Sequence, residues 1–140
     1  MQVTPYLNFN GQCKEAFEFY EKVLGGKIGS MMTYGGSPMG GEMPPEMNDR
    51  VMHAHMLIGD QVLMASDSPP EYYQKPQGLF VSLHFKDEAE GKRIFDDLAE
   101  GGNVTMPFEK TFWASGFGML TDRYGIPWMV NCEPEGQPSA

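Results

Sequence analysis

The sequence predicts an α+β protein built from two modules, each with the order strand, helix, strand, strand, strand. An internal repeat supports this. YLNFNGQCKEAFEFYEKVLGGK, from Tyr6, aligns without a gap with SLHFKDEAEGKRIFDDLAEGGN, from Ser82, at an offset of 82 − 6 = 76 residues. Each copy reads as a short strand, an amphipathic helix and a glycine stop, and three strand-like runs follow each helix. This order excludes a βαβ alternation with a parallel sheet.

The helices are recognised by their spacing and by the residues at their ends. The apolar stripe of the first helix consists of Cys13, Phe17, Tyr20 and Leu24. We expect Asn10 to be its N-cap and Gly25 to end it. Asp87 is the expected N-cap of the second helix, and the apolar stripe there is Ile94, Phe95 and Leu98.

The remaining segments are strands and connections. The expected strands after the two helices are 27–34, 50–58, 61–66, 103–112, 115–121 and 126–132. The modules are therefore 1–66 and 78–133, joined by a linker at 67–77. Residues 35–49 are rich in Gly, Pro and Met, so we expect a flexible loop without regular structure and with few bulky anchors. The tail, 134–140, is expected to be disordered.

Composition limits the partners of this protein. The chain has 140 residues and a formal net charge of −9, with no cluster of Lys or Arg. We therefore expect no binding to nucleic acid or to an anionic membrane surface. The sequence contains no run of 18 apolar residues, so no membrane span is expected. The N-terminus does not resemble a signal peptide. The two cysteines form no CxxC pattern, so a cytoplasmic protein with free thiols is expected.

Alternation along residues 51–58 predicts which side chains face a ligand. Met52, Ala54, Met56 and Ile58 are apolar and are expected to pack on the helix. Val51, His53, His55 and Leu57 then face the opposite side, which we interpret as a cleft. The same reasoning places Thr4, Tyr6, Asn8, Phe80, Ser82, His84, Phe117, Met119 and Thr121 on the cleft side of their strands.

The three histidines admit three interpretations. His53, His55 and His84 are candidate catalytic residues, because imidazole titrates near neutral pH. They are also candidates for polar cleft residues that bond to each other, to water or to a ligand, which is the interpretation we favour. A histidine metal site is the third possibility, but it would need another ligand near His53 and His55, and His84 lies on the other module.

Two further motifs have a functional and a structural interpretation. In TFWASGFG, Trp113 and Phe117 could stack on a planar ligand, with the glycines allowing close approach. Alternatively, Trp113 belongs to the core or to a dimer interface, and the glycines form a bulge. Asp122 is expected to shape a turn. Cys13, on the apolar stripe of the first helix, is expected to be a buried and inert thiol.

The sequence resembles the vicinal oxygen chelate superfamily, which includes glyoxalase I, bleomycin-resistance proteins and extradiol dioxygenases. The segments EAFEFYEKVLGGK, HAHMLIGDQVLMASD, EGKRIFDDLAEGG and TFWASGFGMLTDRYGIPWMVN are similar to the PhnB-like branch, some of whose members are labelled 3-demethylubiquinone methyltransferase. The resemblance implies a curved mixed sheet around a cleft, with helices outside, and a homodimer. It places the superfamily's metal-ligand positions near Thr4, Phe80, Met64 and Met129, which are poor ligands for such metals. We therefore predict no cofactor, and the resemblance disfavours a divalent metal without ruling it out.

Taken together, residues and resemblance predict a cleft for an unknown small molecule. Its expected lining is Tyr6, Asn8, His53, His55, Met64, Phe80, Ser82, His84, Trp113, Phe117, Met119 and Met129. The expected function is metal-free binding of a small molecule. The alternatives are a metal-dependent lyase or dioxygenase, and a metal-free enzyme that uses cleft histidines for acid/base chemistry. A methyltransferase is not expected, because the glycine pairs follow the helices instead of opening them.

Overall fold

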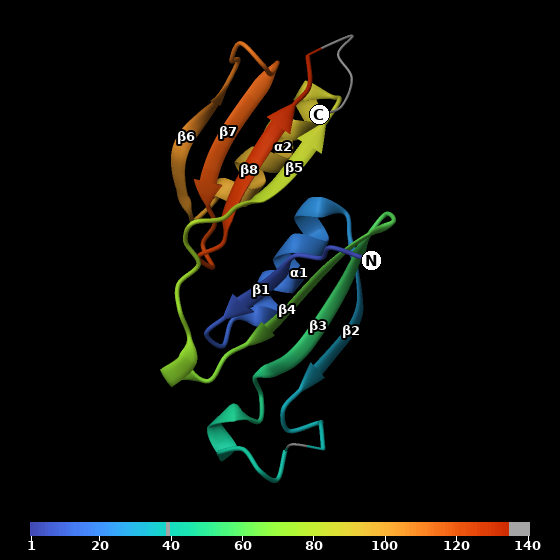
Figure 1. Ribbon diagram of the computed structural model, residues 1–140, viewed down its shortest axis with the longest axis vertical. Helices are drawn as coiled ribbons and strands as arrows, with labels where there is room; N and C mark the ends of the chain where they lie inside the picture. Colours follow the sequence, from blue (N-terminus) through green and yellow to red (C-terminus); the bar gives the residue numbers. More distant parts are fainter. Residues whose placement is uncertain (39, 135–140) are drawn as a thin grey trace. The chain divides into compact units, whose positions relative to one another are not determined.

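The fold was analysed on a computed structural model that describes residues 1–38 and 40–134 (Figure 1). The chain divides into two compact units, Met1–Gln74 and Lys75–Ala140. The first unit contains β1 (Tyr6–Phe9), α1 (Cys13–Leu24), β2 (Lys27–Thr33), β3 (Val51–Ile58) and β4 (Gln61–Asp67). The second contains β5 (Val81–Phe85), α2 (Glu88–Ala99), β6 (Asn103–Glu109), β7 (Gly116–Thr121) and β8 (Pro127–Cys132). The predicted order of elements is confirmed.

Each unit forms a four-stranded mixed sheet with the same topology. The strand orders are β1-β4-β3-β2 and β5-β8-β7-β6. The first strand of each unit pairs in parallel with the last, and all other pairs are antiparallel. α1 contacts β2, β3 and β4, and α2 contacts all four strands of its own sheet. Each sheet therefore has one face that carries a helix and one that does not (Figure 1).

The cores lie between each helix and its sheet. In the first unit the largest fully buried side chains are Phe9, Phe17, Tyr20 and Met56, and in the second they are Trp128, Leu98, Leu120 and Ile126. Trp128 does not lose its polar contact on burial, since its Nε1–H donates to Asp122 Oδ2 at 2.8 Å. Asp122 Oδ1 also accepts from the N–H groups of Tyr124 and Ile126. Asp122 therefore shapes the β7–β8 turn, as expected.

The start of α1 differs from the prediction. The N-cap is Gln12, which makes no capping bond with its side chain, so the assignment of Asn10 is wrong. The cap comes instead from Asp67, the last residue of β4. Its buried carboxylate accepts from the N–H groups of Gly11 at 2.8 Å, Cys13 at 3.0 Å and Val51 at 2.8 Å. A carboxylate at this helix end also interacts favourably with the helix dipole.

The glycine pair after each helix has a packing reason. The first glycine of each pair, Gly25 and Gly101, has a positive φ of 70° and 75°. The second, Gly26 and Gly102, has close neighbours: a Cβ would lie 2.7 Å from the Met56 sulfur and 3.0 Å from the Leu57 carbonyl oxygen in one unit, and would collide with the backbone oxygen of Thr121 in the other. The repeat is therefore preserved in three dimensions as well as in the residue pattern.

Two expectations about the connections are corrected. Residues 35–49 contain a short 3₁₀ helix, Pro45–Met47, so the expectation that they lack regular structure is wrong. Met47 is 3% exposed and is one bulky anchor of the loop, whose flexibility stays a prediction. Asp67 belongs to β4, because it pairs with Phe9, and not to the linker. Of the expected tail, residues 135–140 lie outside the described residues. No helix in the described part of the chain is long and apolar enough to cross a membrane.

Candidate functional site

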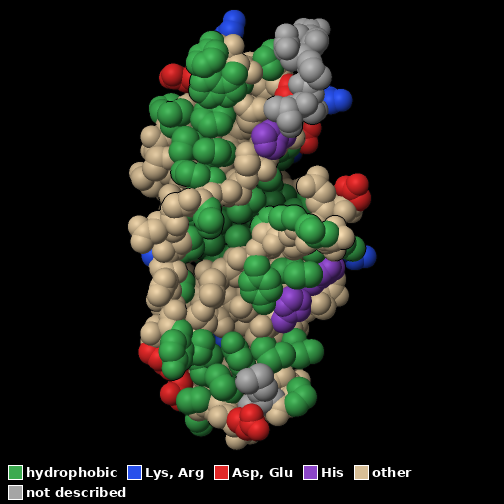
Figure 2. Space-filling view, in the orientation of Figure 1, with side chains coloured by type: hydrophobic (Ala, Val, Ile, Leu, Met, Phe, Trp, Pro, Cys, Tyr) green, Lys and Arg blue, Asp and Glu red, His purple; other side chains and the backbone are tan. Residues whose placement is uncertain are grey.

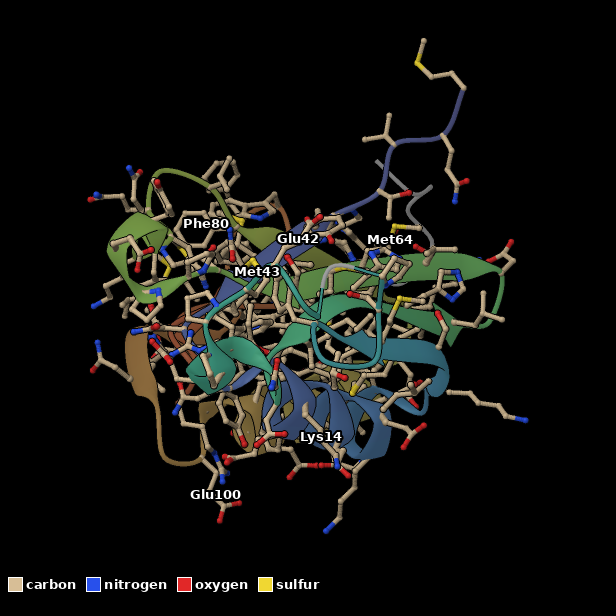
Figure 3. All side chains as sticks on the ribbon, turned by 90° about the horizontal axis from the view of Figure 1, so that it is seen from below. Lys14, Glu42, Met43, Met64, Phe80 and Glu100 are labelled. Carbon is tan, nitrogen blue, oxygen red and sulfur yellow. The ribbon has the colours of Figure 1, made fainter. Side chains whose placement is uncertain are left out.

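The face of the first sheet that carries no helix holds the residues expected to line a site. Met64 pairs with Tyr6 on one side and with His55 on the other, so these three side chains share a face. The neighbouring row, Leu7, Ala65 and Ala54, is buried toward α1. Met64 lies on the side of the sheet away from Lys14 of α1 (Figure 3). We call the face formed by Tyr6, Asn8, His53, His55 and Met64 the open face of the first sheet.

Tyr6 and His53 interact directly on this open face. The Tyr6 hydroxyl lies 3.1 Å from His53 Nδ1, and the two ring centroids are 5.8 Å apart. The direction of the hydrogen bond depends on the His53 tautomer. Tyr6 remains 51% exposed, so the pair is accessible from solvent. A hydroxyl and an imidazole in this contact can pass a proton to or from a molecule bound beside them.

A polar cluster holds one end of the same sheet. Ser68 Oγ donates to Asn8 Oδ1, and one Arg50 nitrogen donates to Asn10 Oδ1 at 3.0 Å and to the Ser68 carbonyl at 2.8 Å. Asn8 lies on the open face, as predicted from its place two residues after Tyr6 on β1, but its side-chain oxygen already accepts a hydrogen bond from Ser68. The Tyr34 hydroxyl donates to the Asp67 carbonyl at 3.1 Å. Burial, and then the charge of Asp67, raise the pKa of Tyr34.

One residue of β3 departs from the alternation. Val51, expected on the open face, is 1% exposed. The β2–β3 register shifts between Met32 and Thr33, where His53 and Val51 are the successive partners on β3. The extra residue on β3 breaks the period of two, and the side-chain direction changes with it. His53 and His55, which follow this shift along β3, are partially exposed.

The second sheet has an equivalent face without a helix. Ser82, Met129 and Met119 form one row across β5, β8 and β7, and His84, Asn131 and Phe117 form the next. Ser82 Oγ lies 3.0 Å from His84 Nε2. We call these six residues the open face of the second sheet. Histidine and hydrophobic side chains are both visible at the molecular surface in Figure 2. Phe80, expected on the first strand of this unit, precedes β5 and is 42% exposed.

Trp113 lies beside this open face on the β6–β7 connection. Its ring centroid is 5.3 Å from that of Phe117 and 4.8 Å from that of Phe112. β6 ends at Glu109, earlier than predicted. The reason is a turn in which Thr111 Oγ1 accepts from the N–H groups of Trp113 and Ala114. Trp113 is 46% exposed, which excludes the interpretation as a core residue.

The glycines of this motif have a packing reason. Gly116 and Gly118 are buried, and a Cβ at either position would collide with aromatic rings on the helix side of the sheet, those of Phe108 and Phe95. Those two rings are 5.5 Å apart. The glycines therefore let aromatic side chains pack against the sheet.

The two thiols are buried and unsuited to nucleophilic chemistry. Burial, with a smaller contribution from the charge of Asp67, raises the pKa of Cys13 to about 12. Burial, assisted by Glu88 and other acids, raises the pKa of Cys132 to about 11. Since the thiolate is the reactive form, both remain protonated at neutral pH. Within the described residues, no group of three or more His, Cys, Asp or Glu could hold a metal ion.

The structure brings together some predicted site residues and leaves others apart. Tyr6, Asn8, His53, His55 and Met64 share one sheet, whereas the remaining predicted residues belong to the second unit. The sequence did not reveal two features of the site. The first is the role of Asp67, whose one signal was its position as an acidic residue at the end of a strand in which buried and less buried residues alternate. The second is the contact between Tyr6 and His53, which is diagonal across strands that are not adjacent.

Two βαβββ units, each with one open sheet face, define an α+β protein of the glyoxalase/bleomycin-resistance class. The fosfomycin resistance protein FosX from Listeria monocytogenes shares this fold, with a TM-score of 0.66 at 7% identity over 96% of this chain and 94% of that one. Residues 1–131 match the family described as 3-demethylubiquinone-9 3-methyltransferase, and the chain belongs to that family.

Several relatives are similar over almost their whole length. Protein YjdN from Escherichia coli K12 is 34% identical over 139 residues, which is 94% of this chain and 95% of that protein. The crystal structure of protein PA1353 from Pseudomonas aeruginosa has a TM-score of 0.87 at 48% identity, over 95% of this chain and 98% of that one. A PhnB protein from Bacillus cereus, described as a putative 3-demethylubiquinone-9 3-methyltransferase, has a TM-score of 0.79 at 26% identity, over 94% and 99%.

Proposed function

We propose that this protein binds an aromatic or otherwise apolar small molecule on its open sheet faces, without a divalent metal. The observation that carries the proposal is the Trp113–Phe117 ring pair. Two aromatic rings in edge contact at 5.3 Å, one of them half-exposed, leave a ring surface on which a planar ligand can stack. Met119 and Met129, in the adjoining row, supply adaptable apolar contacts.

The family description names a methyltransferase, but the local geometry favours binding instead. A nucleotide-type cofactor site uses a parallel sheet and a glycine-rich turn between a strand and a helix. The two strand-to-helix connections here, 10–12 and 86–87, contain one glycine between them. The N–H of that residue, Gly11, is already bonded to Asp67. The first turn of α2 carries Glu88 and Glu90, which disfavour a phosphate.

Tryptophan fluorescence tests this proposal. The chain has two tryptophans, and only Trp113 is exposed, since Trp128 is fully buried. Titration with anilinonaphthalene sulfonate should quench Trp113 or transfer its excitation to the probe. Trp113→Ala should weaken binding about fivefold, whereas Trp113→Phe should keep most of it. Tyr72→Ala is the control, because Tyr72 is also a surface aromatic, 73% exposed, but lies off the open faces.

The result that contradicts the proposal is equally direct. If Trp113→Ala and Tyr72→Ala bind the probe as tightly as the unchanged protein, the Trp113–Phe117 surface is not a binding site. Metal analysis of the purified protein tests the remaining part. One equivalent of a divalent metal per chain, lost in a His53→Ala/His55→Ala variant, would contradict metal-free binding.

The Tyr6–His53 contact favours a second candidate function, acid/base catalysis on the bound molecule. Its 3.1 Å separation is within the range required for proton transfer, and the pair is open to solvent. Turnover, once a substrate is found, should fall in both Tyr6→Phe and His53→Gln, with the affinity for substrate little changed. Activity retained in both variants would leave binding as the function.

We further propose that the protein is a homodimer, because large apolar side chains on its sheets are exposed to solvent. Met32, Leu57, Val104 and Met106 are 43–45% exposed on β2, β3 and β6. Pairing of two chains would remove such side chains from water.

A further inference from the structure

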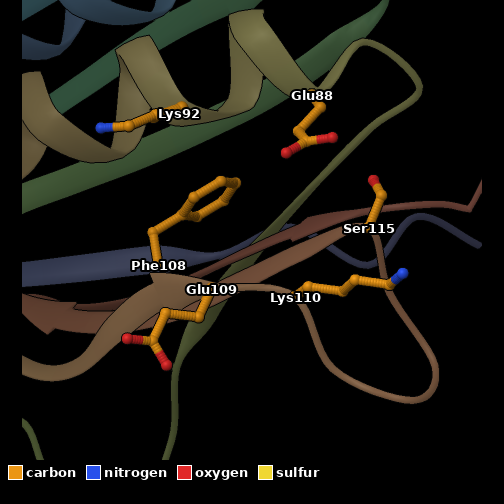
Figure 4. A pocket seen from close by; sticks show the side chains of 6 residues that line it. All are labelled: Glu88, Lys92, Phe108, Glu109, Lys110 and Ser115. Carbon is orange, nitrogen blue, oxygen red and sulfur yellow. The ribbon is translucent and has the colours of Figure 1, made fainter.

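A cavity of about 450 Å³ lies on the helix-bearing side of the second sheet, apart from the open face. It is lined by Glu88, Lys92, Phe108, Glu109, Lys110 and Ser115 (Figure 4). Phe108 packs against Phe95 of α2, which places the cavity between the first turn of α2 and the end of β6. Its volume lies in the range of sites for small organic ligands.

Three of the groups that line this cavity attract a cation. Glu88 carries a carboxylate that makes no hydrogen bond or ion pair within the described residues. Ser115 Oγ directs its single hydrogen at the carbonyls of Cys132 and Glu133, at 3.3 and 3.2 Å, so only its lone pairs remain available. The Phe108 ring offers the negative face of its π system. In Figure 4 these three groups converge from the helix and the sheet.

The cations near the cavity differ in their availability. Lys92 is engaged with Asp96 at 2.8 Å. Lys110, at the rim after the end of β6, has no such partner in the described part of the chain. Glu109 extends away from the cavity in Figure 4, in agreement with its pairing with Phe117 on the open face. The cavity therefore presents an exposed carboxylate from Glu88 and an exposed ammonium from Lys110, neither with a partner among the described residues, and an aromatic surface from Phe108 between helix and strand.

We propose that this cavity binds a small zwitterion with an apolar body, of the amino-acid class. The ligand's ammonium lies against Glu88, Ser115 and the Phe108 ring, and its carboxylate pairs with Lys110. A simple anion at the start of α2 is a poorer fit, because the first turn carries two acidic residues and the helix already has Asp87 as its cap. The proposal does not depend on the open faces.

Amide NMR spectra with three matched probes test each contact. L-phenylalanine carries both charges, phenethylamine lacks the carboxylate, and hydrocinnamate lacks the amine. L-phenylalanine should produce saturable shifts centred on the amides of Lys92, Glu109 and Ser115. Glu88→Gln should weaken L-phenylalanine and phenethylamine about threefold to fivefold and leave hydrocinnamate unchanged, because the charge is partly exposed. Lys110→Gln should weaken L-phenylalanine and hydrocinnamate by a similar factor and leave phenethylamine unchanged.

Two control variants separate a site from general electrostatics. Glu90→Gln and Lys86→Gln change the net charge in the same way, but neither residue lines the cavity. They should leave all three affinities unchanged. The proposal is overturned if L-phenylalanine at millimolar concentration gives no saturable shift, or if the control variants weaken binding as much as Glu88→Gln and Lys110→Gln. Shifts confined to the amides of Phe117 and Met119 would also overturn it and assign the ligand to the open face.

Discussion

Replacing Asp67 should destabilise the protein more than replacing any other helix-capping residue. Its carboxylate is 1% exposed and accepts three backbone N–H bonds, at 2.8, 3.0 and 2.8 Å. A hydrogen bond to a charged group contributes roughly 1.5–3 kcal/mol, and a buried donor left without a partner costs about 1–3 kcal/mol. Since these terms are not additive, we expect Asp67→Ala to lower the free energy of unfolding by about 4 kcal/mol.

The isosteric variant gives a finer test. Asp67→Asn keeps the shape of the side chain and one oxygen, which can still accept from Gly11 and Cys13. Its amide group then faces the Val51 N–H, donor against donor, and the charge is lost. We expect an intermediate loss of about 2 kcal/mol. Asp87→Ala is the matched control, because that N-cap is exposed and accepts one bond, so it should cost about 1 kcal/mol.

Urea unfolding followed by circular dichroism measures all three variants. Circular dichroism is the suitable signal because both tryptophans lie in the second unit, whereas Asp67 lies in the first. Midpoints should shift without a change in the slope of the free energy against urea concentration. If Asp67→Ala costs no more than Asp87→Ala, the three bonds do not hold the start of α1, and this account of the cap is wrong.

Four further predictions follow from burial, charge and the connections. His53→Ala and His55→Ala should each cost about 1 kcal/mol or less in thermal melts, and a large loss in both would mean that these side chains belong to the core. Burial raises the pKa of Cys13 to about 12 and that of Cys132 to about 11, above the 9.0 of an exposed thiol. As the pH rises, the two thiols therefore lose their protons in the unfolded chain before they do so in the folded chain. The stability from these thiols is therefore complete below pH 9 and should fall above it by roughly 1.4 kcal/mol per pH unit and thiol, measured by urea unfolding, until the folded thiols ionise. Light scattering should report about twice the 15.6 kDa chain mass, and a monomer at micromolar concentration would contradict the homodimer. In the 35–49 loop, hydrogen exchange should be slower for the bonded amides of Gly35 and Asn48 than for residues 41–43, and equal rates would show that Met47 does not anchor the loop.

Periodicity was sufficient to predict the elements of this fold. The repeat, the apolar stripes of both helices and the alternation at His53 and His55 are local patterns, and each follows from the 3.6- or 2-residue period of its element. The glycine after each helix was likewise predictable, since the chain must leave the helix with a positive φ at that point.

What the sequence could not predict depends on contacts between distant residues. The cap of α1 lies 54 residues from Cys13, so the local candidate, Asn10, was chosen instead. The bulge beside Val51 appears only in the register between two strands. The cavity beside α2 combines Glu88, Phe108 and Ser115 from three segments, and no single segment contains a pattern that indicates a site.

The two helices differ in when they can form during folding. The cap of α2 comes from Asp87, two residues before the N–H that it accepts, so it forms as soon as that turn closes. The cap of α1 requires β4 to arrive first, and closing so long a loop carries an entropic cost before any bond is gained. The two units therefore share an architecture, but we expect them to fold in different orders, with α2 capped from the start and α1 capped only after β4 has paired.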